Sequence, residues 1–575
     1  MPVHNEDIAV IFEEIADLLE IENANPFRVR AYRNAARTVR GLGRELSTMV
    51  AMGYDLTRLP GIGKDLSAKI KEILSSGHSK ALDKLHREMP ASLESLLKLP
   101  GLGPKRVRIL FQELHIKTLG QLEKAANKGL LRKLPGFGVK TEQRVLESIA
   151  AQRSTEKRFL YSVAQRYVEP LLTYLRAIEG VNEVVVAGSY RRGKDTVGDL
   201  DILVTAQTDS PVVQAFIEYD EVADVVSGGK TRATVFLHNG LQVDLRVVEP
   251  RSYGAALYYF TGSKAHNIQV RKLARQRGLK INEYGVFRDK KRIAGKTEAS
   301  VFRTVGLPFI PPELREARGE IEAAQANSLP ELIRLEDLQG DLHVHTRASD
   351  GNAGIEDMAI AAKKRGIRYI AITDHTRNLG VARGLDPERL RQQIEEIDRL
   401  NEKLDSPTIL KGSEVDILED GRLDLPNDIL SQLDLVIGAV HSKFHLSRSR
   451  QTTRICRAME SKYFTLLAHP SGRLLLERDA YDVDMLRIIE TARERGCYLE
   501  LNSQPLRLDL NDDYCKLAKE QSVLISINSD SHNPLQFDYL QGGINQARRG
   551  WLEKENVLNC MSLLQLRNRL RATMG

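Results

Sequence analysis

The chain has 575 residues, of which 84 are Lys or Arg, 77 are Asp or Glu and four are Cys. This length is enough for about three or four domains with cores of their own, and four cysteines without CxxC spacing exclude a disulfide framework. No apolar run approaches a membrane span and the amino terminus lacks a signal-peptide pattern, so we expect a cytoplasmic protein with no membrane partner.

The positive charge is concentrated in the first part of the chain. Residues 1–160 contain 27 Lys and Arg against 19 Asp and Glu, an excess of +8, whereas the other 415 residues contain 57 against 58. An excess confined to one end favours a polyanionic partner, and the lack of a basic amphipathic anchor favours nucleic acid over a membrane. Ordinary surface charge is the alternative, because the excess is modest.

Three copies of one glycine-rich pattern occur in residues 1–150. They read LPGIG at 59–63, LPGLG at 99–103 and LPGFG at 134–138, each before a helix-forming stretch. Glycine lets the backbone approach a phosphate, and the next helix offers free N–H groups and the positive end of its dipole. We therefore predict helix-hairpin-helix elements that bind DNA phosphates without reading bases. We expect one of the three copies, with the third as the candidate, to have a mainly structural role. The DNA-binding positions are Gly61, Gly63, Lys64, Gly101, Gly103, Lys105, Gly136 and Gly138.

The stretch 184–205, VVVAGSYRRGKDTVGDLDILVT, holds paired carboxylates on an apolar strand. Asp199 and Asp201 are two residues apart, so their side chains project from the same face. A third carboxylate, Asp244, lies in another strand-like run, LQVDLRVV. Three carboxylates on adjacent strands can hold two Mg²⁺ ions about 3.5–4 Å apart for an in-line phosphoryl displacement. The alternative is an Asp pair on an exposed strand edge.

Two further stretches offer groups that a nucleotide could use. The Gly188–Ser189 turn supplies backbone and hydroxyl donors for a phosphate, and Arg192 adds positive charge. In residues 258–267, YYFTGSKAHN, the aromatic pair could wall off a sugar and Asn267 could read a minor-groove acceptor. The second stretch is explained equally well as a core strand that runs into a helix.

Residues 341–575 change to short apolar runs that alternate with helical ones, and residues 313–340 read as a surface linker before them. The alternation predicts a parallel sheet closed into a barrel, whose ligands collect at the carboxyl ends of the strands. Nine His and carboxylate residues fall at those ends: His343, His345, Asp350, His375, Glu414, His441, His469, Asp530 and His532.

Nine nitrogen and oxygen ligands without a thiolate fit two or three Zn²⁺ or Mn²⁺ ions. Glu414 is the natural bridge between such ions, which would activate water for phosphoester hydrolysis. Three basic residues close to these strand ends, Arg347, Arg383 and Lys443, are candidates to bind the phosphate.

Residues 1–312 resemble a family X DNA polymerase. The matching pieces are NPFRVRAYRNAA, LPGIG, LPGLG, GSYRRG…GDLDILV, VDLRVV, YFTGS and INEYGVF. The resemblance implies a multidomain α+β and α/β chain. Its expected parts are an N-terminal helical, lyase-like domain at 1–90, a fingers-like helical domain at 91–155, a nucleotidyltransferase palm at 156–250, a thumb-like subdomain at 251–312, the linker at 313–340 and the barrel at 341–575.

The same resemblance implies roles for single residues. Asp199, Asp201 and Asp244 would hold the catalytic metal pair, and Asp244 would act as the base towards the primer 3′-hydroxyl. The nucleotide would contact Gly188, Ser189, Arg192, Tyr259, Phe260, Gly262, Asn267 and Arg271, the aromatic pair excluding a 2′-hydroxyl. Lys69 falls on the family's deoxyribose-phosphate lyase lysine. Lys264 departs from the pattern, because some members carry an acidic residue there.

The second half resembles a PHP domain through DLHVHT, TDH, GSEVD, AVHS, AHP and SDSH. This implies a (β/α)7-type barrel in which all nine positions are ligands, with Asp350 where many members have His. The implied groups are His343, His345, Glu414 and Asp530 at one ion, Glu414, His441 and His469 at a second, and Asp350, His375 and His532 at a third. Because no ligand is missing, we expect an active phosphodiesterase.

As a whole, the chain is similar to polymerases of the bacterial and archaeal PolX type. The resemblance implies a monomeric repair polymerase that fills short gaps in base excision repair with dNTPs and Mg²⁺ or Mn²⁺ on gapped or primer–template DNA. Its PHP domain would be a Mn²⁺- or Zn²⁺-dependent 3′–5′ exonuclease, with abasic-site cleavage or 3′-end cleaning as compatible extensions. Two alternatives stay open: a non-catalytic DNA-structure-binding scaffold, and a template-independent nucleotidyltransferase fused to a small-molecule phosphatase.

Overall fold

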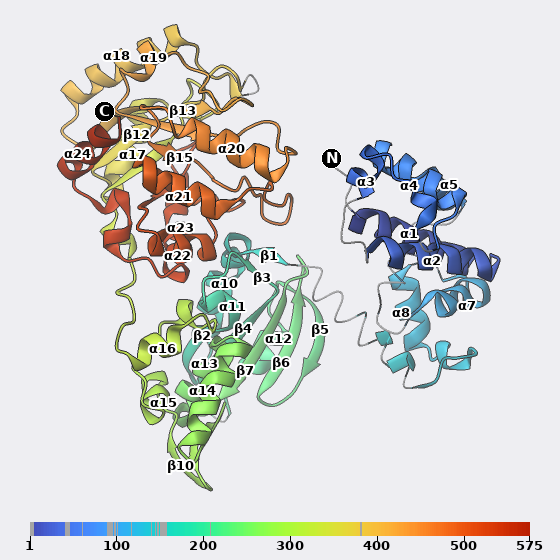
Figure 1. Cartoon of the computed structure of the whole chain (residues 1–575). Coiled ribbons are helices and arrows are strands. Elements are labelled where there is room, and N and C mark those ends of the chain that lie inside the picture. Colours follow the sequence, from blue (N-terminus) through green and yellow to red (C-terminus); the bar gives the residue numbers. More distant parts are fainter. Residues whose placement is uncertain are drawn as a thin grey trace. The chain divides into compact units, whose positions relative to one another are not determined.

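The computed structural model divides the chain into two compact units, Met1–Glu156 and Lys157–Gly575, coloured blue to cyan and green to red in Figure 1. It describes all residues except 1–4, 23, 41–45, 60, 77, 89–95, 97–98, 100–101, 117, 140, 144, 147–148, 150–157, 208, 380–381 and 575. Among the described helices, none has the length and apolar character needed to cross a bilayer.

The first unit is helical, as the glycine-rich repeats predict. Its described α-helices are α1 (Asn5–Ile21), α2 (Pro26–Arg40), α3 (Leu46–Ala51), α4 (Lys64–Ser76), α5 (Lys80–Glu88), α7 (Pro104–Leu114) and α8 (Leu119–Asn127). One core forms around Phe12 and Tyr32, and a second around Leu110 of α7. Gly61 and Gly136 of the repeats adopt φ of 77° and 80°, a left-handed conformation that favours glycine.

The palm is a five-stranded sheet in the order β2-β4-β7-β6-β5. Its strands are β2 (Val181–Val186), β4 (Asp199–Ala206), β5 (Val222–Gly228), β6 (Arg232–Leu237) and β7 (Gln242–Val248), and its helices include α10 (Tyr161–Arg176) and α12 (Val212–Ile217). Leu171 of α10 and Phe216 of α12 share a core with Leu200 and Ile202 of β4. Side chains alternate along a strand, and Asp201 lies between Leu200 and Ile202. The Asp201 side chain therefore projects from the opposite face of the sheet.

The thumb follows the palm and begins with two helices. Its elements are α13 (Tyr253–Thr261), α14 (Lys264–Gln276), β8 (Leu279–Asn282), β9 (Gly285–Arg288), β10 (Lys291–Ala294) and α15 (Glu298–Thr304). Tyr259 and Phe260 therefore lie on a helix, and the alternative of a core strand at this point is wrong. Ala256 and Leu257 of α13 pack with Ala187 and Leu203, which joins the thumb to the carboxylate-bearing face of the palm.

The expected surface linker is largely folded onto the thumb. It contains η4 (Pro312–Leu314), α16 (Glu320–Gln325) and η5 (Leu335–Asp337). Leu314, Ile321 and Ala324 belong to the thumb core, and Arg315 and Glu320 are both 0% exposed. A purely solvated connection is therefore wrong for the first part of this segment. The sequence does not show this burial, because each of the two charged groups has a partner distant in sequence, Glu298 for Arg315 and His266 for Glu320.

The second half is the expected barrel of seven parallel strands in the order β11 to β17. The strands are β11 (Gly340–Val344), β12 (Tyr369–Ile372), β13 (Thr408–Asp416), β14 (Leu435–Ala439), β15 (Leu466–Leu467), β16 (Tyr498–Asn502) and β17 (Ile525–Asn528). A parallel bridge between Val344 and Ser531 brings the first strand to the end of the last one. The sheet is therefore nearly closed, with the helices around it in Figure 1.

The barrel is filled by alternate side chains of its strands. Its described helices are α17 (Ile355–Lys364), α18 (Pro387–Lys403), α19 (Asn427–Leu430), α20 (Arg448–Ala458), α21 (Met485–Arg495), α22 (Asp512–Glu520), α23 (Leu540–Arg549) and α24 (Leu563–Met574). Tyr369 and Ala371 of β12 pack in the same cluster as Leu566 and Leu570 of α24, whereas Ile370 faces the other cluster. The apolar filling supports the polar strand ends above it.

Candidate metal centres

Asp201 and Asp244 are paired residues of the parallel strands β4 and β7, and Asp199 lies one pleat further along on the same face. Asp244 is held by two neighbours, Thr234 Oγ1 and Gln242 Nε2, the amide at 2.8 Å from Oδ2. The sequence pattern therefore predicted the arrangement of the three carboxylates correctly. The alternative of an Asp pair on an exposed edge is wrong, because β4 lies between β2 and β7.

The three carboxylates repel one another when they are ionised. Burial, followed by the charges of Asp199 and Asp244, raises the pKa of Asp201 to about 7. Burial and Asp244 also raise the pKa of Asp199. A cluster whose charged form is this unfavourable in the bare protein is suited to divalent cations, which remove the repulsion and prefer carboxylate oxygens.

The Gly188–Ser189 turn lies directly against this cluster. Gly188 has φ of 61° and begins the short helix α11 (Gly188–Arg191). A Cβ at Gly188 would lie 2.6 Å from Asp201 Oδ2, so only glycine permits this approach. Arg192 follows at the end of the turn, where its Nε donates to Glu316 at 2.8 Å and its Nη1 to Thr261 O at 2.7 Å. The turn carries Ser189 next to Gly188, and the charge of Arg192 partly offsets the rise in the pKa of Asp199 and Asp201.

The expected nucleotide-binding residues of the thumb share one corner between α13 and α14. The rings of Tyr259 and Phe260 meet edge to face, and Arg246 of β7 lies over the Phe260 ring at 4.6 Å. Asn267 Nδ2 donates to Tyr259 O at 2.7 Å and to Gly262 O at 3.2 Å. Its amide therefore shapes the Gly262 turn, a local role that spacing could not reveal. The remaining expected contact, Arg271, donates from Nε to Asn267 O at 3.2 Å.

The expected DNA-binding residues of the first unit lie at helix starts. Lys64 opens α4, and Lys105 lies in the first turn of α7, whose N-cap residue is Gly103. Gly63, Gly136 and Gly138 flank the other described turns, and Gly101 lies outside the described residues. The expected lyase residue, Lys69, forms an ion pair with Asp65.

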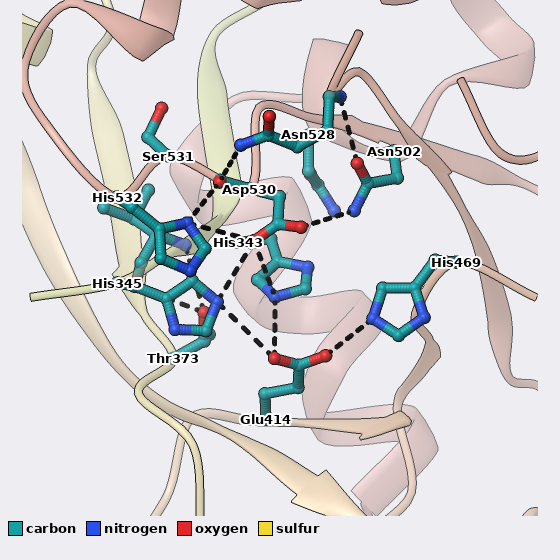
Figure 2. Close-up of polar contacts among 12 residues, drawn as sticks. His343, His345, Thr373, Glu414, His469, Asn502, Asn528, Asp530, Ser531 and His532 are labelled. Atoms are coloured by element: carbon teal, nitrogen blue, oxygen red, sulfur yellow. Dashed lines mark hydrogen bonds and ion pairs between the residues drawn. The ribbon is translucent and has the colours of Figure 1, made fainter. Parts of the chain in front are cut away.

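All nine expected barrel ligands meet at one end of the barrel, with Glu414 at their centre. Figure 2 shows the Glu414 carboxylate between His343, His345 and His469. Its Oε2 lies 2.9 Å from His375 Nδ1 and 3.3 Å from His343 Nε2, and its Oε1 lies 2.8 Å from His469 Nε2. The expected position of Glu414 between ligand groups agrees with this geometry.

The cluster contains three groups of residues, and within each group the ligand atoms lie within 4.8 Å of one another. They are His345 with Asp350, His375 and His532, then His343 with His345 and Asp530, and finally His375 with Glu414 and His441. Compared with the implied groups, Glu414 is absent from the set of His343, His345 and Asp530, and His345 also joins the set of Asp350, His375 and His532. His375 stands beside Glu414 and His441, where His469 was expected. His469 contacts the opposite oxygen of Glu414 instead.

Two buried carboxylates contact the Nδ1 atoms of His343 and His441, which are the ring nitrogens that face away from the other ligands. The sequence patterns did not identify these two carboxylates. Glu500 of β16 lies 2.7 Å from His343 Nδ1 and also accepts the backbone N–H of His469 at 2.7 Å. Asp416 of β13 faces His441 Nδ1 at 2.5 Å. A carboxylate on the outer nitrogen orients an imidazole and directs its inner lone pair to a metal. An acidic residue inside an apolar strand, as in YLELN, was the available signal.

The inner ring atoms fit a metal centre. His343 Nε2 and both ring nitrogens of His345 are buried without a hydrogen-bond partner, and a cation would accept one lone pair from each of these two imidazoles. Burial alone would lower the pKa of His375, but Glu414 and Asp350 outweigh it and raise the pKa to about 10. Burial, with His532 and His375, lowers the pKa of His345 to about 4. His375 is therefore protonated between two carboxylates when no ion is bound, whereas His345 is neutral and has a lone pair available to a metal.

The basic residues around this centre differ from those expected. Arg347 pairs with Asp357, and Lys443 with Glu419. Arg383 is exposed on its loop. Arg507, which the sequence analysis did not select, has its Nε 4.0 Å from Asp530 Oδ2. A guanidinium this close to a ligand carboxylate brings positive charge to the rim of the centre.

Comparison with known protein families matches successive parts of the chain. The matching models are a helix-hairpin-helix domain at residues 3–79, a SAM-like helix-hairpin-helix tandem at 93–151, the DNA polymerase beta palm at 164–252, the DNA polymerase beta thumb at 256–316 and the PHP domain at 341–504. The order of these parts is the order expected from the motifs.

Three curated proteins illustrate the likeness. DNA polymerase/3′–5′ exonuclease PolX of Bacillus subtilis (strain 168) is 39% identical over 565 residues, 98% of each chain. A probable phosphatase of Thermoanaerobacter sp. (strain X514) is 30% identical over 231 residues, 38% of this chain and 89% of its own. DNA polymerase lambda of Rattus norvegicus is 25% identical over 343 residues, 54% of this chain and 56% of its own.

Proposed function

The chain belongs to the family X DNA polymerases that carry a PHP domain, and from that membership we propose how its two metal centres divide synthesis and hydrolysis. It is a DNA-directed DNA polymerase with a 3′–5′ exonuclease. The observation that supports the division best is that one chain holds both a paired carboxylate cluster in the palm and, in the barrel, a cluster of eight ligand residues that His469 joins through Glu414.

The palm carboxylates are the proposed centre of synthesis. Asp199, Asp201 and Asp244 would bind two Mg²⁺ or Mn²⁺ ions, which polarise the phosphate and lower the pKa of the attacking hydroxyl when bound. Asp244 is positioned by Thr234 and Gln242 and faces the primer 3′-hydroxyl as the proton acceptor. Ser189 and Arg192 bind the triphosphate oxygens, which orients the α-phosphate for in-line attack.

The thumb corner is the proposed seat of the incoming nucleotide. Tyr259 and Phe260, fixed edge to face, would border the deoxyribose and leave no room for a 2′-hydroxyl. Asn267 holds the backbone of this corner through Tyr259 O and Gly262 O. Arg271, one helical turn further on, would approach the minor-groove edge of the new base pair.

The barrel cluster is the proposed exonuclease centre. Its nine ligands would bind two or three Mn²⁺ or Zn²⁺ ions, which supply an activated water and neutralise the phosphodiester when bound. Glu500 and Asp416 keep His343 and His441 oriented. Arg507, beside Asp530, would bind a phosphate oxygen of the primer end.

The first unit is the proposed holder of the DNA. The helix starts at Lys64 and Lys105 would bind backbone phosphates on either side of a short gap. Gap filling in base excision repair is the matching task, and the chain would act as a monomer. If Lys69 acts as a lyase nucleophile, sodium borohydride will trap it on DNA that carries a 5′-deoxyribose phosphate, and the Lys69→Ala variant will not be trapped.

A primer assay tests this function with the full chain. A 5′-labelled primer on gapped DNA is incubated with Mg²⁺, Mn²⁺ or Zn²⁺, with and without dNTPs. We expect template-directed lengthening with dNTPs and 3′ shortening without them. DNA binding with neither reaction would support the scaffold alternative. Equal incorporation on matched and mismatched templates would support a template-independent transferase.

A further inference from the structure

The polymerase nucleotide site is linked to the barrel through one shared carboxylate. Arg192, the proposed triphosphate ligand, donates from Nε to Glu316 Oε1 at 2.8 Å, and both side chains are 11% exposed. Arg549, the last residue of α23 in the barrel half, donates from Nη1 to the same oxygen at 3.0 Å and is 5% exposed. Two guanidiniums, one from the palm and one from the barrel half, therefore donate to the same oxygen of Glu316.

Several further hydrogen bonds hold Arg549 in place on the barrel side of this contact. Arg549 Nη1 also donates to Arg192 O at 3.2 Å, and its Nη2 binds Asp512 Oδ2. Asp512 in turn accepts Arg318 Nη2 at 2.7 Å. Next to Arg192, Gly193 has φ of 66°, and a Cβ there would lie 3.2 Å from Asn545 Cβ of α23. Helix α23 therefore packs directly against the loop that carries the nucleotide-site arginine.

Glu316 is the anionic partner of Arg192, whose Nη1 also donates to the uncharged Thr261 O. Burial alone would raise the pKa of Glu316, but the charges of Arg192 and Arg549 outweigh it and lower the pKa. The side chain is therefore ionised at neutral pH. Its next cation, Lys194, is 3.8 Å from Oε1, farther than either arginine. When Arg192 leaves Glu316 for a triphosphate, Arg549 is the principal cation that remains on the carboxylate.

An anionic carboxylate beside the triphosphate site opposes nucleotide binding in two ways. It attracts Arg192 away from the phosphates, and it repels the phosphates themselves. A second buried arginine that remains on the carboxylate weakens both effects. Removing that arginine while keeping the carboxylate would leave a buried charge poorly paired, which is the costly outcome for a buried ion pair.

We propose that Arg549 of the PHP half is a positioning residue for DNA synthesis, which neutralises Glu316 and so releases Arg192 to the incoming nucleotide. This inference rests on the proposed role of Arg192 at the polymerase centre. It makes the barrel half part of the polymerase nucleotide site, apart from any hydrolysis that the barrel performs.

The test measures single-turnover gap filling against dNTP concentration for five full-length proteins. They are the wild type, Arg549→Met, Arg549→Lys, Glu316→Gln/Arg549→Met, and the control Arg548→Met. Arg548 is the adjacent residue of α23 and pairs with Glu313 at 2.8 Å, so its loss breaks a junction ion pair that does not involve Glu316. Exonuclease rates on single-stranded DNA are measured in parallel.

For Arg549→Met we expect the apparent nucleotide Kd to rise about 5- to 20-fold while the maximal rate changes by less than about twofold. Glu316→Gln should restore the Kd in the double variant, because no carboxylate is left to hold Arg192. Arg549→Lys should lie between the wild type and Arg549→Met, and Arg548→Met should match the wild type.

An unchanged Kd in Arg549→Met, a defect that Glu316→Gln does not rescue, or an equal defect in Arg548→Met would overturn the proposal. If Arg549→Met does not fold, the Arg549→Lys and Arg548→Met pair decides the same question. A wild-type chain that extends no primer would instead contradict the proposed polymerase function, so the two failures are distinguishable.

Discussion

Asp201 of β4 and Asp244 of β7 are direct partners across a parallel strand pair, and both carboxylates project from the same face of the palm sheet. Burial, with the charges of Asp199 and Asp244, raises the pKa of Asp201 to about 7. The arrangement is therefore electrostatically unfavourable unless cations are bound. This relationship is what links the sequence pattern to metal-dependent chemistry.

The first prediction concerns the pH dependence of stability. The folded chain binds the Asp201 proton more tightly than the unfolded chain, so its stabilising contribution is present below about pH 4 and is lost as pH rises to about 7. Without divalent ions, Asp201→Asn should therefore be more stable than the wild type at pH 8, by about 1–3 kcal/mol, and should show no advantage at pH 4.

Thermal unfolding in EDTA at both pH values measures this difference. Added Mg²⁺ should reduce the advantage of Asp201→Asn at pH 8, because cations relieve the same repulsion in the wild type. The exposed residue Asp209 provides the control, and Asp209→Asn should match the wild type throughout. Equal stability of Asp201→Asn and the wild type in EDTA at pH 8 would contradict the assigned repulsion.

The second prediction concerns the turn against the carboxylates. Gly188→Ala should lower the rate of synthesis by at least about 100-fold, because its Cβ would lie 2.6 Å from Asp201 Oδ2 and must displace that carboxylate. Gly278→Ala is the matched control, since Gly278 has φ of 67° with no heavy atom within 4 Å of its Cβ position.

Both alanine variants should lose about 1–2 kcal/mol from backbone strain. Only Gly188→Ala should lose synthesis, measured by single-nucleotide insertion with saturating dNTP. A similar loss of activity in both variants would show that backbone strain matters and that the contact with Asp201 does not.

The third prediction concerns the buried carboxylate behind His343. Glu500→Gln replaces the negative partner of the imidazole by a neutral amide, so the barrel should bind Mn²⁺ about 10- to 100-fold more weakly. Exonuclease activity should fall at low Mn²⁺ and recover at high Mn²⁺, while primer extension with Mg²⁺ stays unchanged. Titration calorimetry and exonuclease assays over Mn²⁺ concentration measure this, with the surface variant Glu494→Gln as control. A loss that Mn²⁺ does not restore would argue against an orienting role.

The fourth prediction concerns the helix starts of the first unit. Lys64→Ala and Lys105→Ala should each weaken binding to gapped DNA and reduce the slope of log K against log salt by about 1, equally for unrelated sequences. Lys403→Ala on α18 removes an exposed charge from the barrel half and should leave the slope unchanged. Fluorescence anisotropy over a salt series is the measurement. A sequence-dependent effect would contradict phosphate binding by the hairpins.

Local patterns predicted the parts of the fold that depend on local rules. The i, i+2 spacing of Asp199 and Asp201 predicted their common face, and the alternation of apolar and helical runs predicted the parallel barrel. The nine ligands lie in or just after six of the seven strands, and the seventh, β16, contributes Glu500 behind His343. These features need only neighbouring residues, which a single sequence contains.

Features that depend on distant partners could not be predicted. The role of Arg315 as a buried residue requires Glu298, 17 positions earlier, and the pairing of Arg549 with Glu316 spans 233 positions. Glu500 and Asp416 resemble ordinary polar residues until His343 and His441 are placed beside them. Ion pairs between distant segments produce no periodic pattern in the sequence. For this reason residues 313–340 were predicted to be a solvent-exposed linker.

The most direct test of the account follows one 5′-labelled primer on gapped DNA with two double variants, Asp199→Asn/Asp201→Asn and His343→Ala/His345→Ala. We expect the first to shorten the primer at the wild-type rate and to lose extension by at least about 100-fold. The second should extend the primer and lose shortening. If either double variant loses both reactions while its thermal unfolding and DNA affinity match the wild type, the assignment of two independent centres is contradicted.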